Sequence, residues 1–355
     1  MNKQIIIIIF ISFLTACARI GPDIIQASGN DYNVAIQQTN NEQLLLNLVR
    51  LKYRETPYFL EVNSVSSQFA LTSEAAISAN FKKQQTPEAV GLSGKLNYSE
   101  QPTVTYLPLH GNDFIQRLLS PISIDTILLL ANSGWSIERI LRLTVQSING
   151  IPNAPTASGP TPNEVPVYKD FIDLTEELRK LQKNGTLKLA YSQEEGKETP
   201  VILLDEKNLL PVKLQMLLDI EPGNTYTLTA GTGKNTNKHS IVISTRSLLG
   251  VMYYLSHSVN VPEQDKKAGK VTITKDQYGN EFDWNELTQG LFKIQSANQI
   301  NTSSAIGTKY RGNWFYIDDN DLDSKTTFSL LTQLFSLQAG KAEGITPVLT
   351  LPIGK

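Results

Sequence analysis

Apolar residues along the chain follow two different periods, and these periods predict where helices and strands lie. A helix is predicted over residues 40–54, because apolar residues recur there at helical spacing: Leu44, Leu45, Leu48, Val49 and Leu51. Thr39-Asn40-Asn41-Glu42 precedes them and has the residue types of a capping box. From residue 58 to 81, and again from 95 to 106, apolar and polar residues alternate, which is typical of strands. The Gly-rich segment 91–94 separates these two regions.

Helical spacing returns between residues 111 and 150, where three helices are predicted. The first two cover 114–119 and 124–131, and the third begins at the N-cap Ser136 and continues to Ile148. Further helices are predicted over 168–183, 247–256 and 321–338, and further strands over 187–191, 201–204, 225–229, 240–244, 310–317 and 347–351. Strands 225–229 and 240–244 flank a polar loop, so we expect them to form a hairpin. Helices and strands alternate without a regular repeat, which predicts the α+β class with mixed strands and amphipathic helices.

A Pro-rich segment divides the chain into two predicted lobes. Residues 151–166 hold five prolines and show no hydrophobic period, which is typical of a linker. We therefore expect an N-terminal α+β domain over residues 39–150 and a C-terminal α+β domain over residues 167–355.

The N-terminus has the form of a bacterial lipoprotein signal peptide. Lys3 precedes an apolar run of about ten residues, which is half the roughly 20 residues that a membrane-spanning helix needs. Leu14-Thr15-Ala16-Cys17 follows and resembles a lipobox, which implies that residues 1–16 are removed and that Cys17 carries lipid, including palmitate. Residues 17–38 are polar and are predicted to be a tether. Residue 18 is Ala rather than Asp, which favours anchoring in the outer membrane, at its periplasmic face.

Charge and composition narrow the function further. The net charge is only −2, so nothing in the charge favours a nucleic-acid partner, and 40% hydrophobic residues suffice for a packed core. Cys17 is the only cysteine, which rules out a disulfide within one chain.

Two polar segments resemble ligand-binding motifs but depart from them. Gly231-Thr232-Gly233-Lys234 lacks the earlier glycine and the final Ser or Thr of a phosphate-binding loop, so a hairpin loop is predicted. Asp319, Asp321 and Asp323 match the first ligand positions of a calcium loop, but Ser324 and Leu330 stand where Gly and Glu are required. We expect these carboxylates to cap the helix that follows them. No metal and no cofactor is predicted.

Catalytic residues are not apparent in the sequence. His110, His239 and His257 lie in separate predicted elements without zinc or triad spacing, and no Gly-x-Ser-x-Gly motif is present. Facing carboxylates can act as acid and base without any local sequence signature, so a hydrolase of carbohydrate or peptidoglycan stays an alternative.

Three consecutive aromatic residues, Trp314-Phe315-Tyr316, form a candidate partner surface. A strand directs successive residues to opposite faces. If a core lies on one side of the strand only, at least one of these three residues faces away from it. Packing of both faces in the core is the alternative.

Several segments together resemble a family of proteobacterial outer-membrane lipoproteins without an assigned activity. They are Asp31–Ile36, Glu42–Tyr53, Thr56–Val62, Pro108–Gly111 with Phe114, Leu118–Ile122, Thr245–Val251 and Trp314–Thr327. The resemblance extends over nearly the whole mature chain and implies no catalytic residue. Some similar lipoproteins are accessory subunits of type IV secretion outer-membrane complexes of the Dot/Icm kind, which implies envelope proteins as partners.

These observations favour a non-enzymatic, lipid-anchored structural or accessory subunit of an envelope assembly. Three segments (103–120, 241–256 and 314–338) each lead from a strand into a helix, as modules of ring-shaped complexes do, although ordinary domains do the same. A third interpretation, beside the subunit and the hydrolase, places the strands of residues 58–107 in the membrane, where strands of partner molecules would close the sheet. The polar content of these strands argues against it.

Overall fold

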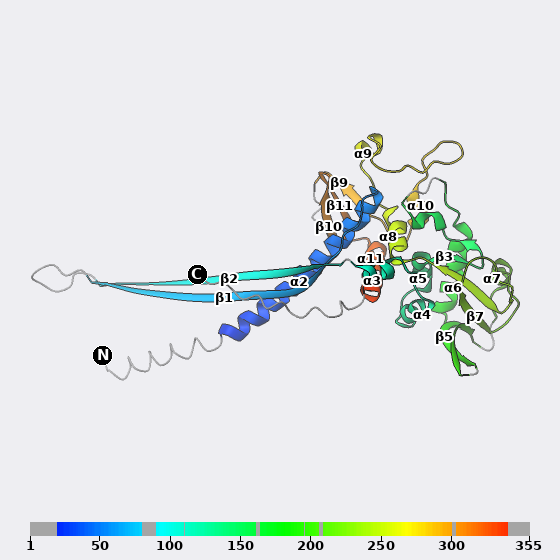
Figure 1. Ribbon diagram of the computed structural model, residues 1–355, viewed down its shortest axis with the longest axis horizontal. Coiled ribbons are helices and arrows are strands. Elements are labelled where there is room, and N and C mark those ends of the chain that lie inside the picture. Colours follow the sequence, from blue (N-terminus) through cyan, green and yellow to red (C-terminus); the bar gives the residue numbers. More distant parts are fainter. Residues whose placement is uncertain are drawn as a thin grey trace, which may run out of the picture. The chain divides into compact units, whose positions relative to one another are not determined.

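The computed structural model describes residues 20–79, 90–109, 111–160, 164–194, 196–205, 209–299 and 303–339 (Figure 1). It has the predicted α+β class, with three sheets of mixed strand direction and helices between them. The chain divides into two compact units: Met1–Asn40 with Leu60–Leu109, and Asn41–Phe59 with His110–Lys355. Within the described ranges, no helix is both long and apolar enough to cross a membrane.

Helix α2 (Ile20–Lys52) begins in the first unit and ends in the second. It starts 20 residues earlier than the predicted helix, so most of the predicted tether is helical. Pro22 lies in its first turn, where a missing N–H costs nothing. The predicted capping box is wrong, because the Thr39 hydroxyl donates to the carbonyl of Ala35 (2.8 Å) inside a continuous helix.

The rest of the first unit is one long antiparallel hairpin. Strand β1 (Leu60–Ala79) pairs with β2 (Val90–Pro108), and the register is continuous except for a shift between Val62 and Ser64. The alternating regions were correctly predicted as strands. The segment 91–94, predicted to lie between strands, is itself part of β2.

Three short helices open the main part of the second unit, close to where they were predicted. They are α3 (Asn112–Leu119), α4 (Ile124–Asn132) and α5 (Ile137–Thr144). Ser136 caps α5 as predicted, since its hydroxyl accepts from the backbone N–H of Arg139. The predicted extension of α5 to Ile148 is wrong: residues 145–148 form strand β3, because they pair with β8.

A six-stranded sheet lies at the centre of the second unit, in the order β4-β3-β8-β7-β6-β5. Its strands are β3 (Val145–Ile148), β4 (Ile151–Pro152), β5 (Leu187–Glu194), β6 (Lys197–Leu204), β7 (Thr225–Ala230) and β8 (Ser240–Thr245). Strands β7 and β8 are parallel, so the predicted hairpin between them is wrong. Helices α4, α5 and α6 (Lys169–Lys183) cover one face of this six-stranded sheet with apolar side chains, among them Ile127, Leu141 and Leu178.

The Pro-rich segment 151–166 lies inside the second unit. It contributes β4 and a 3-10 turn, η2 (Pro155–Ser158), and Asn153, Ala154 and Ala157 are fully buried. Strands that precede this segment and strands that follow it join the same six-stranded sheet. The boundaries between the two compact units therefore lie elsewhere, near residues 40, 60 and 109.

The remaining elements build a smaller three-stranded sheet and the helices around it. The sheet has the order β10-β11-β9 and consists of β9 (Gln295–Ala297), β10 (Ser304–Tyr310) and β11 (Asn313–Asp318). The helices are α7 (Val212–Leu218), α8 (Leu248–Ser256), α9 (Glu263–Lys267), α10 (Trp284–Thr288) and α11 (Leu322–Ala339). The predicted strand 347–351 lies outside the described residues.

Candidate functional site

The hairpin of the first unit exposes two long unpaired strand edges. Strands β1 and β2 contain 20 and 19 residues, whereas typical strands contain about five or six. They form a sheet of their own, and no other strand of the described part of the chain pairs with either edge (Figure 1). Each edge is a row of backbone donors and acceptors that can pair with another chain. A two-stranded hairpin is at best marginally stable alone in water, so a partner strand would stabilise it.

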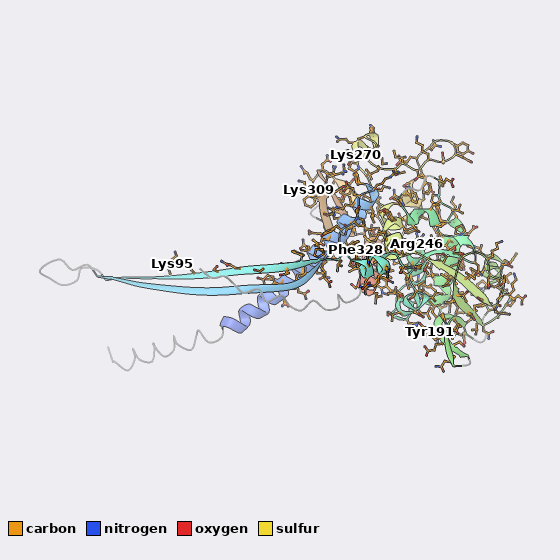
Figure 2. All side chains as sticks on the ribbon, in the orientation of Figure 1. Lys95, Tyr191, Arg246, Lys270, Lys309 and Phe328 are labelled. Carbon is orange, nitrogen blue, oxygen red and sulfur yellow. The ribbon has the colours of Figure 1, made fainter. Side chains whose placement is uncertain are left out.

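Side chains on both faces of β2 are exposed at the positions described between Lys95 and Tyr106. Lys95, Asn97 and Ser99 are exposed on one face, and Lys95 is marked on the ribbon in Figure 2. Val104 and Tyr106, which alternate with polar residues, are also exposed, at 39% and 44%.

A polar pocket of about 480 Å³ lies in the second unit, where four elements meet. Lys52 comes from the end of α2, His257 follows α8, Lys266 belongs to α9, and Trp284 begins α10. Val259, Val261, Val271 and Ile273 add apolar lining. The pocket therefore combines two ammonium groups with an aromatic and aliphatic wall.

His257 is held in its neutral form at the wall of this pocket. Its ring stacks on Trp284, with ring centroids 4.2 Å apart and an angle of 19° between the planes. Burial, followed by the charge of Lys52, lowers the pKa of His257 to about 3, although hydrogen bonds to the backbone of Ala157 and Gly159 oppose the shift. The Nε2 atom is buried without a partner among the described residues. Protonation would thus introduce a second cation beside Lys52.

Lys52 is a largely buried cation. Its Nζ atom donates to the carbonyl oxygen of His257 (3.4 Å), and none of the ion pairs found within the described ranges includes it. Burial, followed by the charge of Lys266, lowers the pKa of Lys52 to about 8, while Glu281 opposes the shift. A buried ammonium without a carboxylate partner favours binding of an anion.

Two carboxylates approach each other at the mouth of the same pocket. Lys266 Nζ lies 3.2 Å from Glu263 Oε1 and 2.8 Å from Glu281 Oε1, so the three groups form one ionic cluster. A glycosidase uses two facing carboxyl groups as acid and base. In this cluster both carboxylates form ion pairs with the same ammonium group.

The acidic segment before α11 caps that helix, as predicted. Asp321 Oδ1 accepts from the backbone N–H of Ser324 (3.0 Å), and Asp321 Oδ2 accepts from the Ser324 hydroxyl (2.6 Å). Asp319 forms an ion pair with Lys325 (2.5 Å), and Asp323 forms one with Arg139 (2.6 Å). In the part of the chain that the structure describes, no group of three or more His, Cys, Asp or Glu residues could hold a metal ion.

Arg246 is a fully buried cation that the sequence did not reveal as special. Its guanidinium donates to the backbone carbonyls of Arg142 (3.1 Å), Leu143 (3.2 Å) and Val145 (2.5 Å), and also to that of Asn153. It lies 4.1 Å from the ring centroid of Tyr254, and burial lowers its pKa to about 10. These contacts tie α5, β3 and the Pro-rich segment to α8, so its role is structural.

The three aromatic residues of β11 lie in two different environments. Phe315 is fully buried and contacts Tyr53 and Tyr310 edge-on or tilted, with centroids 6.3 Å and 6.4 Å away. Trp314 and Tyr316 lie on the opposite face and are half-buried. A partner surface would therefore consist of Trp314 and Tyr316, with Phe315 as their support in the core.

The other residues singled out in the sequence are not brought together. Cys17 and His110 lie outside the described residues. His239 lies 3.8 Å from Glu221, on the surface and apart from the pocket of His257. The loop with Gly233 and Lys234 connects two strands rather than preceding a helix, as predicted, but these strands are parallel, so the loop is not the predicted hairpin loop.

Comparison of the chain with protein-family models, with curated proteins and with solved structures finds no match. Its function must therefore be argued from the hairpin, the pocket and the sequence themselves.

Proposed function

We propose that this chain is a lipid-anchored, non-enzymatic subunit of a bacterial cell-envelope assembly. Cys17 would hold it at the periplasmic face of the outer membrane, and pairing of hairpin edges between copies would build the assembly. The long hairpin with two unpaired edges is the observation that carries this proposal.

The structure of the edges supports pairing rather than its avoidance. Proteins blunt exposed edges with prolines, bulges, inward charges or very short strands. The paired stretch from Phe69↔Glu100 to Ala79↔Val90 is long and contains neither a proline nor a bulge. Its lysine, Lys95, pairs in register with Glu74, so the charges favour the hairpin itself.

The resemblance to envelope lipoproteins suggests the kind of assembly. A type IV secretion outer-membrane complex is the candidate that it implies, with other envelope proteins as partners and a ring as the expected form. Repeated use of the same two edges would join the copies head to tail. Such contacts close into a ring where the rotation from one copy to the next adds up to a full turn.

Mixing two single-cysteine variants of the lipidated protein tests the pairing of edges. Thr72 and Asn97 are opposite each other in the register of one hairpin. Each variant carries only one of the cysteines Thr72→Cys and Asn97→Cys, so a disulfide between them can form only between two molecules. To cover the different registers in which two copies could pair, the cysteine in β2 is also moved one residue at a time from position 95 to position 101. Lys213→Cys on α7, a side chain 64% exposed, serves as the matched control.

We expect cross-linked pairs at a subset of hairpin positions and none with Lys213→Cys, together with particles of several subunits in mild detergent. A lone monomer without co-purifying envelope proteins, and without cross-links at any hairpin position, would overturn the proposal.

A further inference from the structure

The outer part of the hairpin has one face that is almost wholly apolar. Pairing of β1 with β2 is regular from Phe69 to Ala79, so alternate residues share a face. One face takes Phe69, Leu71, Ser73, Ala75, Ile77 and Ala79 from β1, and Val90, Leu92, Gly94, Leu96, Tyr98 and Glu100 from β2. Ser73 and Glu100 are the polar residues among these twelve positions, and Glu100, which is charged, lies at the end of the stretch.

The opposite face of the same stretch is polar and small. It takes Ala70, Thr72, Glu74, Ala76 and Ser78 from β1, and Gly91, Ser93, Lys95, Asn97 and Ser99 from β2. Glu74 and Lys95 lie on this face and pair directly with each other, whereas Glu100 lies at the end of the apolar face. Over the nine pairs from Leu71↔Tyr98 to Ala79↔Val90, Ser73 is the one polar side chain that belongs to the apolar face, so the polar content of this part is concentrated on the other face.

The length of the apolar face matches a lipid bilayer. Nine consecutive pairs run from Leu71↔Tyr98 to Ala79↔Val90, and a membrane-spanning strand needs about 9–11 residues. At roughly 3.3 Å per residue, nine residues extend about 30 Å, close to the hydrocarbon thickness. Phe69 and Tyr98 lie at one end of the stretch, as aromatic residues do at a membrane interface, and the next positions on that face are Ser67, Glu100 and Pro102.

From this register we infer that residues 69–79 and 90–98 cross a lipid bilayer, and that hairpins from several copies close edge to edge around a water-filled passage. This inference rests on the proposed assembly and adds its location and its activity. A single hairpin cannot lie in lipid, since each unpaired backbone group costs several kcal/mol there. Copies of the same hairpin supply the missing partners, with the apolar face towards lipid and the face of Glu74 and Lys95 towards water.

Fluorescent labelling of single cysteines tests the location residue by residue. The lipidated full chain is reconstituted into vesicles of phosphatidylethanolamine and phosphatidylglycerol, with an environment-sensitive dye at one position from 70 to 78. Cys17 does not interfere where its thiol carries lipid. We expect blue-shifted emission at Leu71, Ala75 and Ile77, quenched by brominated lipid, and water-like emission at Thr72, Glu74 and Ala76. Dye at Thr103 and Thr105, beyond the apolar stretch, should stay water-like.

Release of a small trapped dye tests the passage. Wild-type protein should release it, and Ile77→Lys on the apolar face should abolish release, whereas the matched change Ser78→Lys on the polar face should retain it. Particle mass in detergent shows whether each variant still assembles.

The outcomes separate this inference from the proposed function. Particles of normal mass with water-like emission at all positions would overturn membrane insertion and leave the assembly intact. Alternating emission without dye release would overturn the passage. Monomers throughout would overturn the assembly on which both depend.

Discussion

The imidazole of His257 stacks on the indole of Trp284, with ring centroids 4.2 Å apart, and burial keeps that imidazole neutral. The folded-state pKa of about 3 lies below the ordinary value of 6.5, so the unfolded chain takes up a proton first as the pH falls. Stability contributed by this site is therefore complete above pH 6.5 and is lost progressively towards pH 3. At pH 5 the loss should be about 2 kcal/mol.

His257→Phe keeps a ring beside Trp284 and removes the titration. We expect the free energy of unfolding of the wild type to fall between pH 7 and pH 5 by about 2 kcal/mol more than that of the variant. Urea unfolding followed by tryptophan fluorescence at both pH values measures this. His239→Phe, on the surface, is the control and should titrate like the wild type; equal slopes for wild type and His257→Phe would contradict the assignment.

Lys52 gives a pH dependence of the same sign on the alkaline side, because its pKa is also lower in the folded state. Its folded-state pKa of about 8 lies below the ordinary value of 10.5, so the cost of burying the ammonium is complete below pH 8 and is relieved as the pH rises. Lys52→Met should stabilise the protein at pH 7 by about 2 kcal/mol, since the lost hydrogen bond to His257 offsets part of the shift. The gain should shrink by pH 9.5. Urea unfolding at both pH values checks it, and an unchanged or lower stability at pH 7 would refute it.

The sequence predicted local features of the fold well, because local chemistry determines them. Ser136 and Ser247 precede apolar stretches at helical spacing, and both cap helices in the structure. It could not predict the direction of β7 and β8, because a strand's hydrophobic pattern is the same in parallel and antiparallel pairs. The short connection between them made a hairpin the default. Helix α5 was predicted too long because Val145 and Ile148 fit helical spacing and strand pairing equally well.

The candidate sites were harder to predict because they depend on distant contacts. Lys52, His257, Lys266 and Trp284 come from separate parts of the chain and have no local motif. The hairpin carried a usable signal in its alternation, but Gly91 and Gly94 interrupted it. Only the register shows that Gly94 shares the face of Ala75 and that the polar residues fall on the other side.

Arg246 should be irreplaceable even by lysine. Its planar guanidinium donates in several fixed directions, to four backbone carbonyls and to the Ser158 hydroxyl (3.0 Å). A lysine has three donors on one atom, so Arg246→Lys leaves buried carbonyls unpaired, each at about 1–3 kcal/mol. We expect a loss of about 3 kcal/mol or more in urea unfolding. A cost below 1 kcal/mol would show that these bonds contribute little.

Two neighbouring carboxylates before α11 should differ in how much they stabilise the protein. Asp321→Ala removes both hydrogen bonds to Ser324 and should cost about 1–2 kcal/mol. Asp319→Ala removes only a surface ion pair with Lys325 and should cost about 0.5 kcal/mol or less. Thermal unfolding of the two variants, measured side by side, compares them. Equal costs would mean that the capping bonds do not determine the stability of this helix.

The aromatic residues of β11 separate core packing from partner binding. Phe315→Ala removes a fully buried ring and should cost about 3–5 kcal/mol of stability. Trp314 and Tyr316 lie half-buried on the other face, so Trp314→Ala and Tyr316→Ala should each cost about 1 kcal/mol. If this face binds an envelope partner, the same two variants should lose partners that co-purify with the lipidated protein, whereas Tyr278→Ala, at a side chain 81% exposed, should retain them. Urea unfolding and quantitative mass spectrometry of the purified complexes measure the two effects. Full retention of partners by both variants would show that this face supports the fold alone.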